Sequence, residues 1–203
     1  MLKIDLRKEL AWLYKPSAKT ISLVDVPAMN FIMIDGKGSP ESEQYRQSIE
    51  ALYPVAYTLK FAMKFAGQDF TVMALEGLWW ADDMSAFDPE TGNRNAWQWT
   101  MMMMQPDFIT STDFEAAVKA ARQKKDLPGL SKIRFERFKE GRAAQLMHIG
   151  PYSAEGPNIM KLHEKIREIG GELTGKHHEI YLSDPRRTDP SKWKTVIRQP
   201  YRI

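Results

Sequence analysis

The order of predicted secondary structure elements repeats along the chain, and this repeat constrains the fold more than any other feature of the sequence. Each half contains a strand, a helix and two further strands. The first half is predicted to have strands at 28–34, 69–80 and 96–104, with a helix from Ser39 to about Phe61. The second half is predicted to have a strand pair at 132–138 and 142–149, a helix around 159–169, and strands at 177–183 and 194–199. Because each such unit leaves one sheet face uncovered, pairing two units would bury both faces against helices.

The predicted fold class is therefore α+β. We expect duplicated strand-helix-strand-strand units to form an antiparallel sheet with helices on one side and a ligand groove between the halves. Residues 1–203 are predicted to form a single domain. Within it we expect an N-terminal arm or helix at 1–20, a first half at 21–125, a linker at 126–131 and a second half at 132–203.

Two helix starts carry capping signals. Ser39 is a predicted N-cap, because Pro40 follows it at the position where proline is favoured. Thr112 and Glu115 have the spacing of a capping box. Pro54 lies inside the first helical pattern, and it should kink or split that helix because it removes one backbone donor. Gly141 is predicted to turn the strand pair of the second half.

The segment WQWTMMMMQ, residues 97–105, places four methionines directly after two tryptophans. In a strand, Trp97, Trp99, Met101 and Met103 would share one face, and the other two methionines would lie on the opposite face. Core packing is one interpretation, and the adaptable wall of a pocket for hydrophobic or cationic ligands is another. A soft-metal site is disfavoured, because adjacent strand residues cannot converge on one ion.

Carboxylates also lie within predicted strands. Glu76 alternates with apolar residues in DFTVMALEGLWW, and Glu179 shares a strand face with His177 and Tyr181 in HHEIYLSD. A charged group beside apolar neighbours is costly unless it is paired. Each glutamate therefore indicates an edge position, an exposed face, an arginine partner, or a carboxylate at the bottom of an aromatic pocket. In the last case it could bind a cation or act as a general acid or base.

Three tyrosines complete the candidate residues. Tyr53 and Tyr57 lie four residues apart on one predicted helix face, and Tyr152 follows the Gly150–Pro151 turn. Each is compatible with core or rim packing, and beside a carboxylate each could bind or protonate a ligand oxygen. The four histidines show no metal-ligand spacing, and there is no phosphate-binding glycine loop or nucleophile elbow. We therefore expect no metal and no cofactor.

The amino-acid composition excludes several kinds of site and partner. The chain has no cysteine, which excludes disulfides, thiolate metal sites and cysteine nucleophiles. The N-terminus lacks the apolar core of a signal peptide, and no apolar run approaches the roughly 20 residues needed to cross a bilayer. We therefore expect a cytoplasmic protein without a membrane partner. The net charge of +3 is too weak to indicate nucleic-acid binding, although 119–142 is locally basic.

The segment MHIGPYSAEGPNIMKLHEKIREIGGELTGKHHEIYLSDPRRTDPSKWKTVIRQP, residues 147–200, resembles the second half of the GyrI-like small-molecule-binding domain. That family shows a His-x-Gly-x-Tyr turn, a helix, a Glu-Ile-Tyr strand and a closing strand that ends in proline. The segments IDGKGSPESEQYRQSIEALYPVAYTLKFAMK and LEGLWW resemble the long stand-alone branch of the family. The resemblance extends over nearly the whole chain from about residue 20.

The resemblance implies a duplicated fold with a ligand groove between the halves. Relatives are effector domains of drug-responsive activators, a gyrase-inhibitor antagonist, or free-standing binders of lipophilic aromatic compounds, and some stand-alone members resemble cyclopropanoid cyclopropyl hydrolases. The family's pocket glutamate matches Glu179, the helix tyrosine matches Tyr57, and the aromatic walls match Trp79, Trp97 and Trp99. The DNA-binding domain of the activators has no counterpart in this sequence.

We therefore predict a cytoplasmic binder of flat hydrophobic or cationic small molecules, with an aromatic lipophilic ligand as its partner. The same site is a candidate hydrolase centre for a reactive cyclopropane-type electrophile, which would serve detoxification. The predicted catalytic residues are Glu179 and Tyr57. The predicted ligand-binding residues are Trp79, Trp97, Trp99, Met101, Tyr53, Glu76, Tyr152 and Tyr181. The alternative is a protein–protein interaction module or an effector-binding regulator without catalysis.

Overall fold

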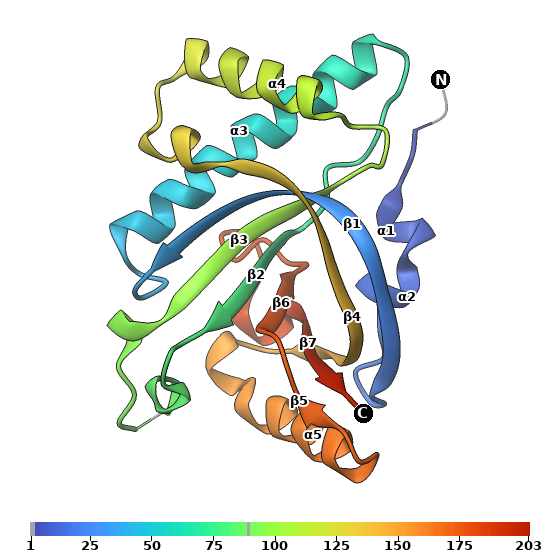
Figure 1. Ribbon diagram of the computed structural model, residues 1–203, viewed down its shortest axis with the longest axis vertical. Coiled ribbons are helices and arrows are strands. Elements are labelled where there is room, and N and C mark those ends of the chain that lie inside the picture. Colours follow the sequence, from blue (N-terminus) through green and yellow to red (C-terminus); the bar gives the residue numbers. More distant parts are fainter. Residues whose placement is uncertain (1–2, 89) are drawn as a thin grey trace. The chain divides into compact units, whose positions relative to one another are not determined.

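The computed structural model describes residues 3–88 and 90–203, and it confirms the predicted α+β class with antiparallel strand pairing. The chain divides into two compact units. Among the described residues, unit 1 contains 3–6, Met29–Met73 and Trp79–Phe138, whereas unit 2 contains Arg7–Ala28, Ala74–Leu78 and Lys139–Ile203. Three strands contribute residues to both units, namely β1 (Ser22–Lys37), β2 (Leu75–Trp80) and β4 (Arg134–Ile149) (Figure 1). The predicted division of the chain at 126–131, the duplication and the groove stay predictions.

Unit 1 is built from β1, β3 (Gln98–Gln105) and two long helices, α3 (Glu43–Phe65) and α4 (Ser111–Lys124). The end of β1 pairs with β3 in antiparallel register, so that Ile32 lies opposite Met103. The two helices pack against each other, and α3 also contacts β3 (Figure 1). Short 3-10 helices occupy the connections: η1 (Met84–Phe87), η2 (Arg94–Ala96) and η3 (Pro128–Lys132). All four methionines of the quartet are buried, so they fill the core of this unit.

The predicted start of the first helix is wrong by three residues. Helix α3 is capped by Ser42, whose hydroxyl accepts a hydrogen bond from the Tyr45 amide at 3.2 Å, and not by Ser39. The Ser39 carbonyl accepts a hydrogen bond from the Ser42 amide, which forms a turn before the helix. Pro54 lies within α3 without dividing it, so the predicted split does not occur.

The predicted capping box of the second helix is also displaced. Thr110 caps α4 by accepting a hydrogen bond from the Asp113 amide at 3.2 Å, and the Asp113 carboxylate accepts one from the Thr110 amide at 2.9 Å. The predicted pair was Thr112 and Glu115, two residues later. Both pairs fit the sequence pattern, and aspartate serves at the third helical position as well as glutamate does.

Two strand predictions need correction. The predicted strand at 69–80 is reduced to β2, because Phe70 forms only an isolated bridge with Ile4. The alternation of apolar residues before β2 therefore reflects the burial of Phe70, because no continuous strand pairing is formed there. The predicted strand pair at 132–149 is the single strand β4, in which Gly141 takes a φ of 78°. Glycine adopts this conformation without steric cost, and here it distorts the strand without reversing it.

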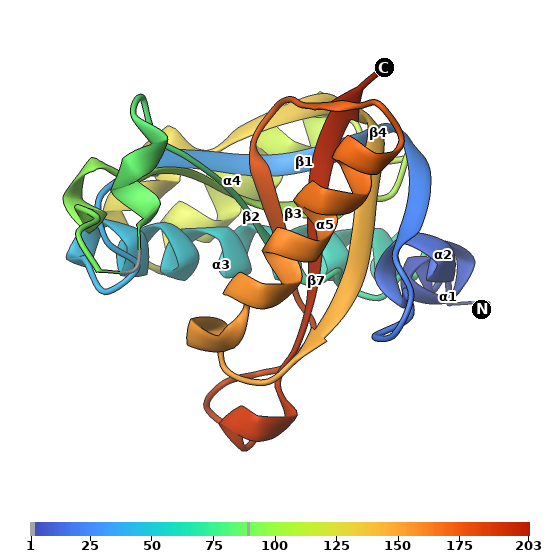
Figure 2. The same cartoon turned by 90° about the horizontal axis from the view of Figure 1, so that it is seen from below.

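Unit 2 centres on β7 (Lys194–Arg202). This strand pairs with β6 (His177–Tyr181), with β4 and with β5 (Glu172–Leu173), all antiparallel. Helix α5 (Gly156–Glu168) packs on β7, where Leu162 and Ile166 join Ile197 in one apolar cluster (Figure 2). The turns η4 (Tyr152–Ala154) and η5 (Pro190–Lys192) precede α5 and β7.

The N-terminal segment forms two short helices, α1 (Leu6–Glu9) and α2 (Ala11–Tyr14), where the sequence predicted an arm or a helix. Tyr14 and Leu13 of α2 are buried in unit 2. None of the helices in 3–88 and 90–203 is long and apolar enough to cross a membrane.

Candidate functional site

Strand alternation in unit 2 places polar groups on both faces of the sheet. Glu179 pairs with Ile197, which packs in the α5 cluster, so Glu179 and its alternate residues His177 and Tyr181 lie on the face towards α5. His178 and Ile180 lie on the opposite face and are buried. The unit therefore carries two polar clusters, which we call the carboxylate cluster (Glu155, Glu179 and Thr195) and the His178 network (Tyr14, Glu76, Glu140, Gln145, His178 and Arg198).

Glu179 is held at the edge of solvent. Its side chain is 17% exposed, and its Oε1 lies 3.4 Å from Nε2 of His177. This contact has ion-pair distance without hydrogen-bond geometry, since His177 Nε2 makes no hydrogen bond within the described chain. A carboxylate in such a position is partly desolvated and still reachable by a ligand, which suits recognition of positive charge.

Glu155 is the second carboxyl group on this face. It precedes the first turn of α5, is 3% exposed, and its Oε1 makes no hydrogen bond to any described residue. Burial, and then the negative charge of Glu179, raise the pKa of Glu155 to about 9. The nearby Thr195 hydroxyl offsets part of this rise, although the pair lacks hydrogen-bond geometry. At neutral pH, therefore, Glu155 is a neutral carboxylic acid.

An aromatic rim adjoins these carboxyl groups. The ring of Tyr152 lies edge-on to Tyr181 at 5.6 Å and tilted on Trp193 at 4.8 Å between centroids. Tyr181 lies directly opposite Thr195 in the β6–β7 ladder, which places the rim next to the carboxylate cluster. Tyr152 is 38% exposed, so the rim is open to ligands. Aromatic faces beside a carboxylate form an environment suited to a hydrophobic cation.

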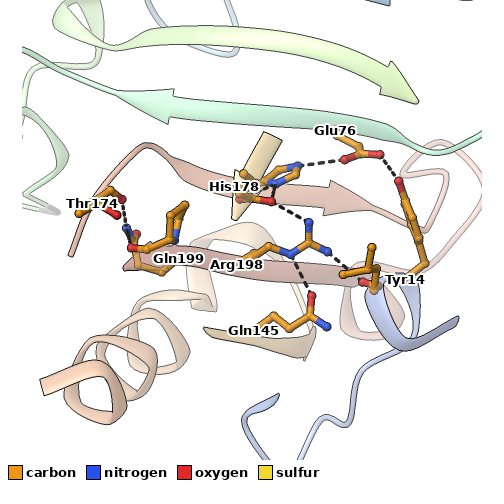
Figure 3. Close-up of polar contacts among 10 residues, drawn as sticks. Tyr14, Glu76, Gln145, Thr174, His178, Arg198 and Gln199 are labelled. Atoms are coloured by element: carbon orange, nitrogen blue, oxygen red, sulfur yellow. Dashed lines mark hydrogen bonds and ion pairs between the residues drawn. The ribbon is translucent and has the colours of Figure 1, made fainter. Parts of the chain in front are cut away.

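The opposite face holds the His178 network (Figure 3). The Tyr14 hydroxyl donates to Glu76 at 2.7 Å, and His178 donates through Nε2 to Glu76 at 3.0 Å and through Nδ1 to Glu140 at 3.0 Å. Arg198 donates to Glu140 at 2.9 Å and to the Gln145 side chain at 2.9 Å. Both ring nitrogens of His178 face carboxylates, which requires the doubly protonated imidazolium.

The charges of the His178 network balance. Burial opposes the charged form of His178, yet Glu140 and the hydrogen bonds to Glu140 and Glu76 raise its pKa to about 9. Burial likewise opposes ionisation of Glu140, yet His178 and Arg198 lower its pKa to about 2. Burial and the charge of Glu76 raise the pKa of Tyr14, which keeps its hydroxyl protonated. Two cations thus neutralise two carboxylates.

This network attaches the N-terminal segment to the sheet of unit 2. Arg198 donates to the Leu13 carbonyl at 3.1 Å, and the Gln145 amide donates to the Trp12 carbonyl at 2.7 Å. Glu76 is 1% exposed, and both of its oxygens accept hydrogen bonds from within the network. It is therefore the more buried of the two strand glutamates, and its contacts give it a structural role.

The predicted aromatic wall lies in unit 1 and is largely core. Trp99 and Met101 are 0% exposed, and a Cβ on Gly36 would approach the Trp99 ring to 2.0 Å, so glycine is needed there for close packing. Trp79 is also buried and lies edge-on to Trp97 at 5.9 Å. A ligand could contact these rings only after displacing their neighbours.

Tyr53 and Tyr57 lie together on α3, as the sequence predicts. Their rings stack at 6.5 Å, and Phe61 continues the row at 6.3 Å from Tyr57. Tyr57 is 47% exposed, so this aromatic stripe is a surface of unit 1. A role of Tyr57 in catalysis stays a prediction.

The structure adds residues that sequence reasoning missed. Glu155 lies in the GPYSAEGPN turn, where only its position before a helix was visible; Thr195 and Trp193 gave no signal. In the described part of the chain, no group of three or more histidines and carboxylates could hold a metal ion. Two hollows of about 330 and 350 Å³ open on unit 1, and neither is lined by a predicted site residue.

Comparison with known proteins now identifies the family. Residues 19–202 match the model of the GyrI-like small molecule binding domain. The chain belongs to this family. Its fold class and the matched residues agree with the resemblance found in the sequence. No curated protein sequence matches the chain significantly.

Solved structures from Listeria innocua are similar to this GyrI-like chain over its whole length. An uncharacterized conserved protein is 41% identical, with a TM-score of 0.90, covering 98% of this chain and 100% of that one. A hydrolase is 40% identical, with a TM-score of 0.84 and the same coverage. Another structure described as a hydrolase is 39% identical, with a TM-score of 0.87, covering 99% of this chain and 100% of that one.

Proposed function

We propose that this GyrI-like domain binds flat, hydrophobic, cationic small molecules on the α5 face of unit 2. The observation that carries the proposal is the position of Glu179, a partly exposed carboxylate next to the open aromatic rim of Tyr152, Tyr181 and Trp193. A cation over an aromatic ring gains roughly 0.5–2 kcal/mol, and a partly desolvated carboxylate adds a charge interaction stronger than one in water. Membership of a small-molecule-binding family supports this choice of partner.

Binding of a cationic dye tests the proposal. We expect rhodamine 6G to bind the wild-type protein, and Glu179→Gln to weaken binding by about 10-fold, because the amide keeps the shape of the carboxylate and removes its charge. Fluorescence anisotropy measures both dissociation constants. Glu172→Gln is the matched control, since Glu172 is exposed and pairs with Arg202 at the surface. Absence of dye binding to the wild type, or equal binding by Glu179→Gln, would contradict the proposal.

We further propose that the same site hydrolyses a strained, cyclopropane-type electrophile, which would make the protein a detoxifying enzyme. Two structures of 40% and 39% identity to this chain are described as hydrolases. In the proposed step, a water oxygen bonds to one ring carbon while a ring C–C bond breaks. Glu179 takes the proton from water, and the conjugated fragment that receives the bond's electron pair is protonated in turn.

Two further elements of the hypothesis concern Tyr57 and cellular location. The match of Tyr57 to the family's helix tyrosine suggests hydrogen bonding to a ligand oxygen, and Tyr57→Phe removes only this hydroxyl. We also propose that the protein acts in the cytoplasm, where electrophiles would reach nucleic acid and protein targets.

A further inference from the structure

Two buried polar atoms in the carboxylate cluster lack hydrogen bonds. Glu155 Oε1 and Thr195 Oγ1 both lie away from solvent, and neither makes a hydrogen bond of normal geometry in the described chain, although Thr195 lies close enough to lower the pKa of Glu155. Buried polar atoms are normally paired, and leaving one unpaired is destabilising because its hydration is lost without replacement. These two atoms belong to side chains that are 3% and 0% exposed, from the turn before α5 and from β7.

The chemistry of the cluster indicates what would satisfy these atoms. The ionised form of Glu179 only accepts hydrogen bonds. The neutral acid of Glu155 has one O–H donor and still offers an acceptor oxygen, and the Thr195 hydroxyl can accept as well as donate. The acceptors of the cluster thus outnumber its two donors, and the cluster carries one negative charge. A group that carries positive charge together with several N–H donors complements both properties, whereas a quaternary ammonium supplies charge alone.

We propose that Glu155, Thr195 and Glu179 form a polar subsite for the protonated amine or amidine of a ligand. N–H groups of the ligand donate to Glu155 Oε1 and Thr195 Oγ1, and its charge lies beside Glu179. The flat part of the ligand lies on the rim of Tyr152 and Tyr181. This inference rests on the ligand binding proposed above and specifies the polar group of the ligand.

The subsite adjoins a surface that ligands can reach. Glu179 is partly exposed, Tyr152 is exposed, and Thr195 lies opposite Tyr181 in the ladder. His148, another polar residue of the α5 face, has partners of its own, since it contacts Asn158 at 3.0 Å and the Pro151 carbonyl at 3.1 Å. It does not compete for the two unpaired atoms, and His177 lies next to Glu179 at 3.4 Å.

A matched pair of ligands tests the subsite. Naphthylmethylammonium and naphthylmethyl-trimethylammonium share the flat ring and the charge, and only the first has N–H donors. Isothermal titration calorimetry at neutral pH gives the ratio of their dissociation constants. We expect the wild type to favour the primary ammonium by about 10-fold, and Glu155→Met to bring the ratio close to one, because methionine removes the acceptor at similar volume.

Two further variants separate the subsite from general packing. Glu155→Gln keeps a carbonyl acceptor and a neutral side chain, so it should retain the preference for the primary ammonium. Thr195→Val removes one acceptor at constant shape and should reduce the preference even where Glu155→Met proves unstable. Thermal unfolding checks that each variant folds.

The outcomes distinguish this inference from the function on which it rests. If both ligands bind the wild type equally well, the subsite is wrong and cation binding stands. If neither binds, the proposed function itself fails. If both Glu155→Met and Thr195→Val still prefer the primary ammonium, other residues accept its N–H groups, and the assignment of the subsite is wrong.

Discussion

Replacing Glu140 by glutamine is expected to lower the free energy of unfolding by about 3–5 kcal/mol. Glu140 is buried between His178 and Arg198, and it is the carboxylate that both cations contact. The amide leaves two buried cations facing the single charge of Glu76, and an uncompensated buried charge is strongly destabilising. Urea denaturation followed by tryptophan fluorescence measures the change. The surface substitution Glu172→Gln is the control, with an expected loss of less than about 1 kcal/mol.

The difference in unfolding free energy between the wild type and Glu140→Gln should also depend on pH, which gives a second, independent test of the charged network. The pKa of His178 is raised from 6.5 to about 9. The stability that protonated His178 contributes to the folded state is therefore complete below pH 6.5 and is lost as the pH rises through 9. The pKa of Glu140 is lowered from 4.5 to about 2. The stability that ionised Glu140 contributes to the folded state is therefore complete above pH 4.5 and is lost as the pH falls towards 2. The stability gap between wild type and Glu140→Gln should therefore be widest between pH 4.5 and 6.5. A gap that is small or independent of pH would contradict the charged form of the network.

Glu179→Gln is expected to reduce hydrolysis of a cyclopropane-bearing electrophile by at least about 100-fold, the usual contribution of a positioned general base. Glutamine keeps hydrogen-bonding capacity for ligand and water but cannot accept a proton from water. Single-turnover consumption of the electrophile, followed by mass spectrometry of the ring-opened product, measures the rate. Thermal unfolding of the variant should match the wild type, because Glu179 lies outside the His178 network.

Glu172→Gln again provides the matched control, since it makes the same chemical change on an exposed strand residue of unit 2. Its turnover should equal that of the wild type. Equal turnover by Glu179→Gln would remove this carboxylate from the chemistry, and absence of turnover by the wild type would reduce the protein to a binder.

Local patterns in the sequence predicted the elements of unit 2 that carry the site. The alternation in HHEIY located β6 and assigned Glu179 and Tyr181 to one face, and the helix predicted around 159–169 corresponds to α5. Helix caps were misplaced by two or three residues, because neighbouring serines and threonines satisfy the same pattern. The predicted turn at Gly141 is wrong, since a glycine that reverses the chain and one that distorts a strand look identical in sequence.

The buried charges could not be predicted in the same way. Glu76 and His178 are separated by 102 residues, and Arg198 reaches Leu13 across 185, so only the folded chain brings them together. The role of Glu155 depends on its burial and on the charge of Glu179, neither of which a local pattern records. Trp99 and Met101 fit both core packing and a pocket wall in the sequence, and in the structure both are buried in unit 1. Ligand contact by these two residues stays a prediction.

A crystal structure of the protein with bound rhodamine 6G tests the central claim most directly. We predict that the dye lies with its flat ring system against Tyr152 and Tyr181 and its positive charge beside Glu179. Binding on a surface that leaves the surroundings of Glu179 unchanged would contradict the assignment of the site to the α5 face of unit 2.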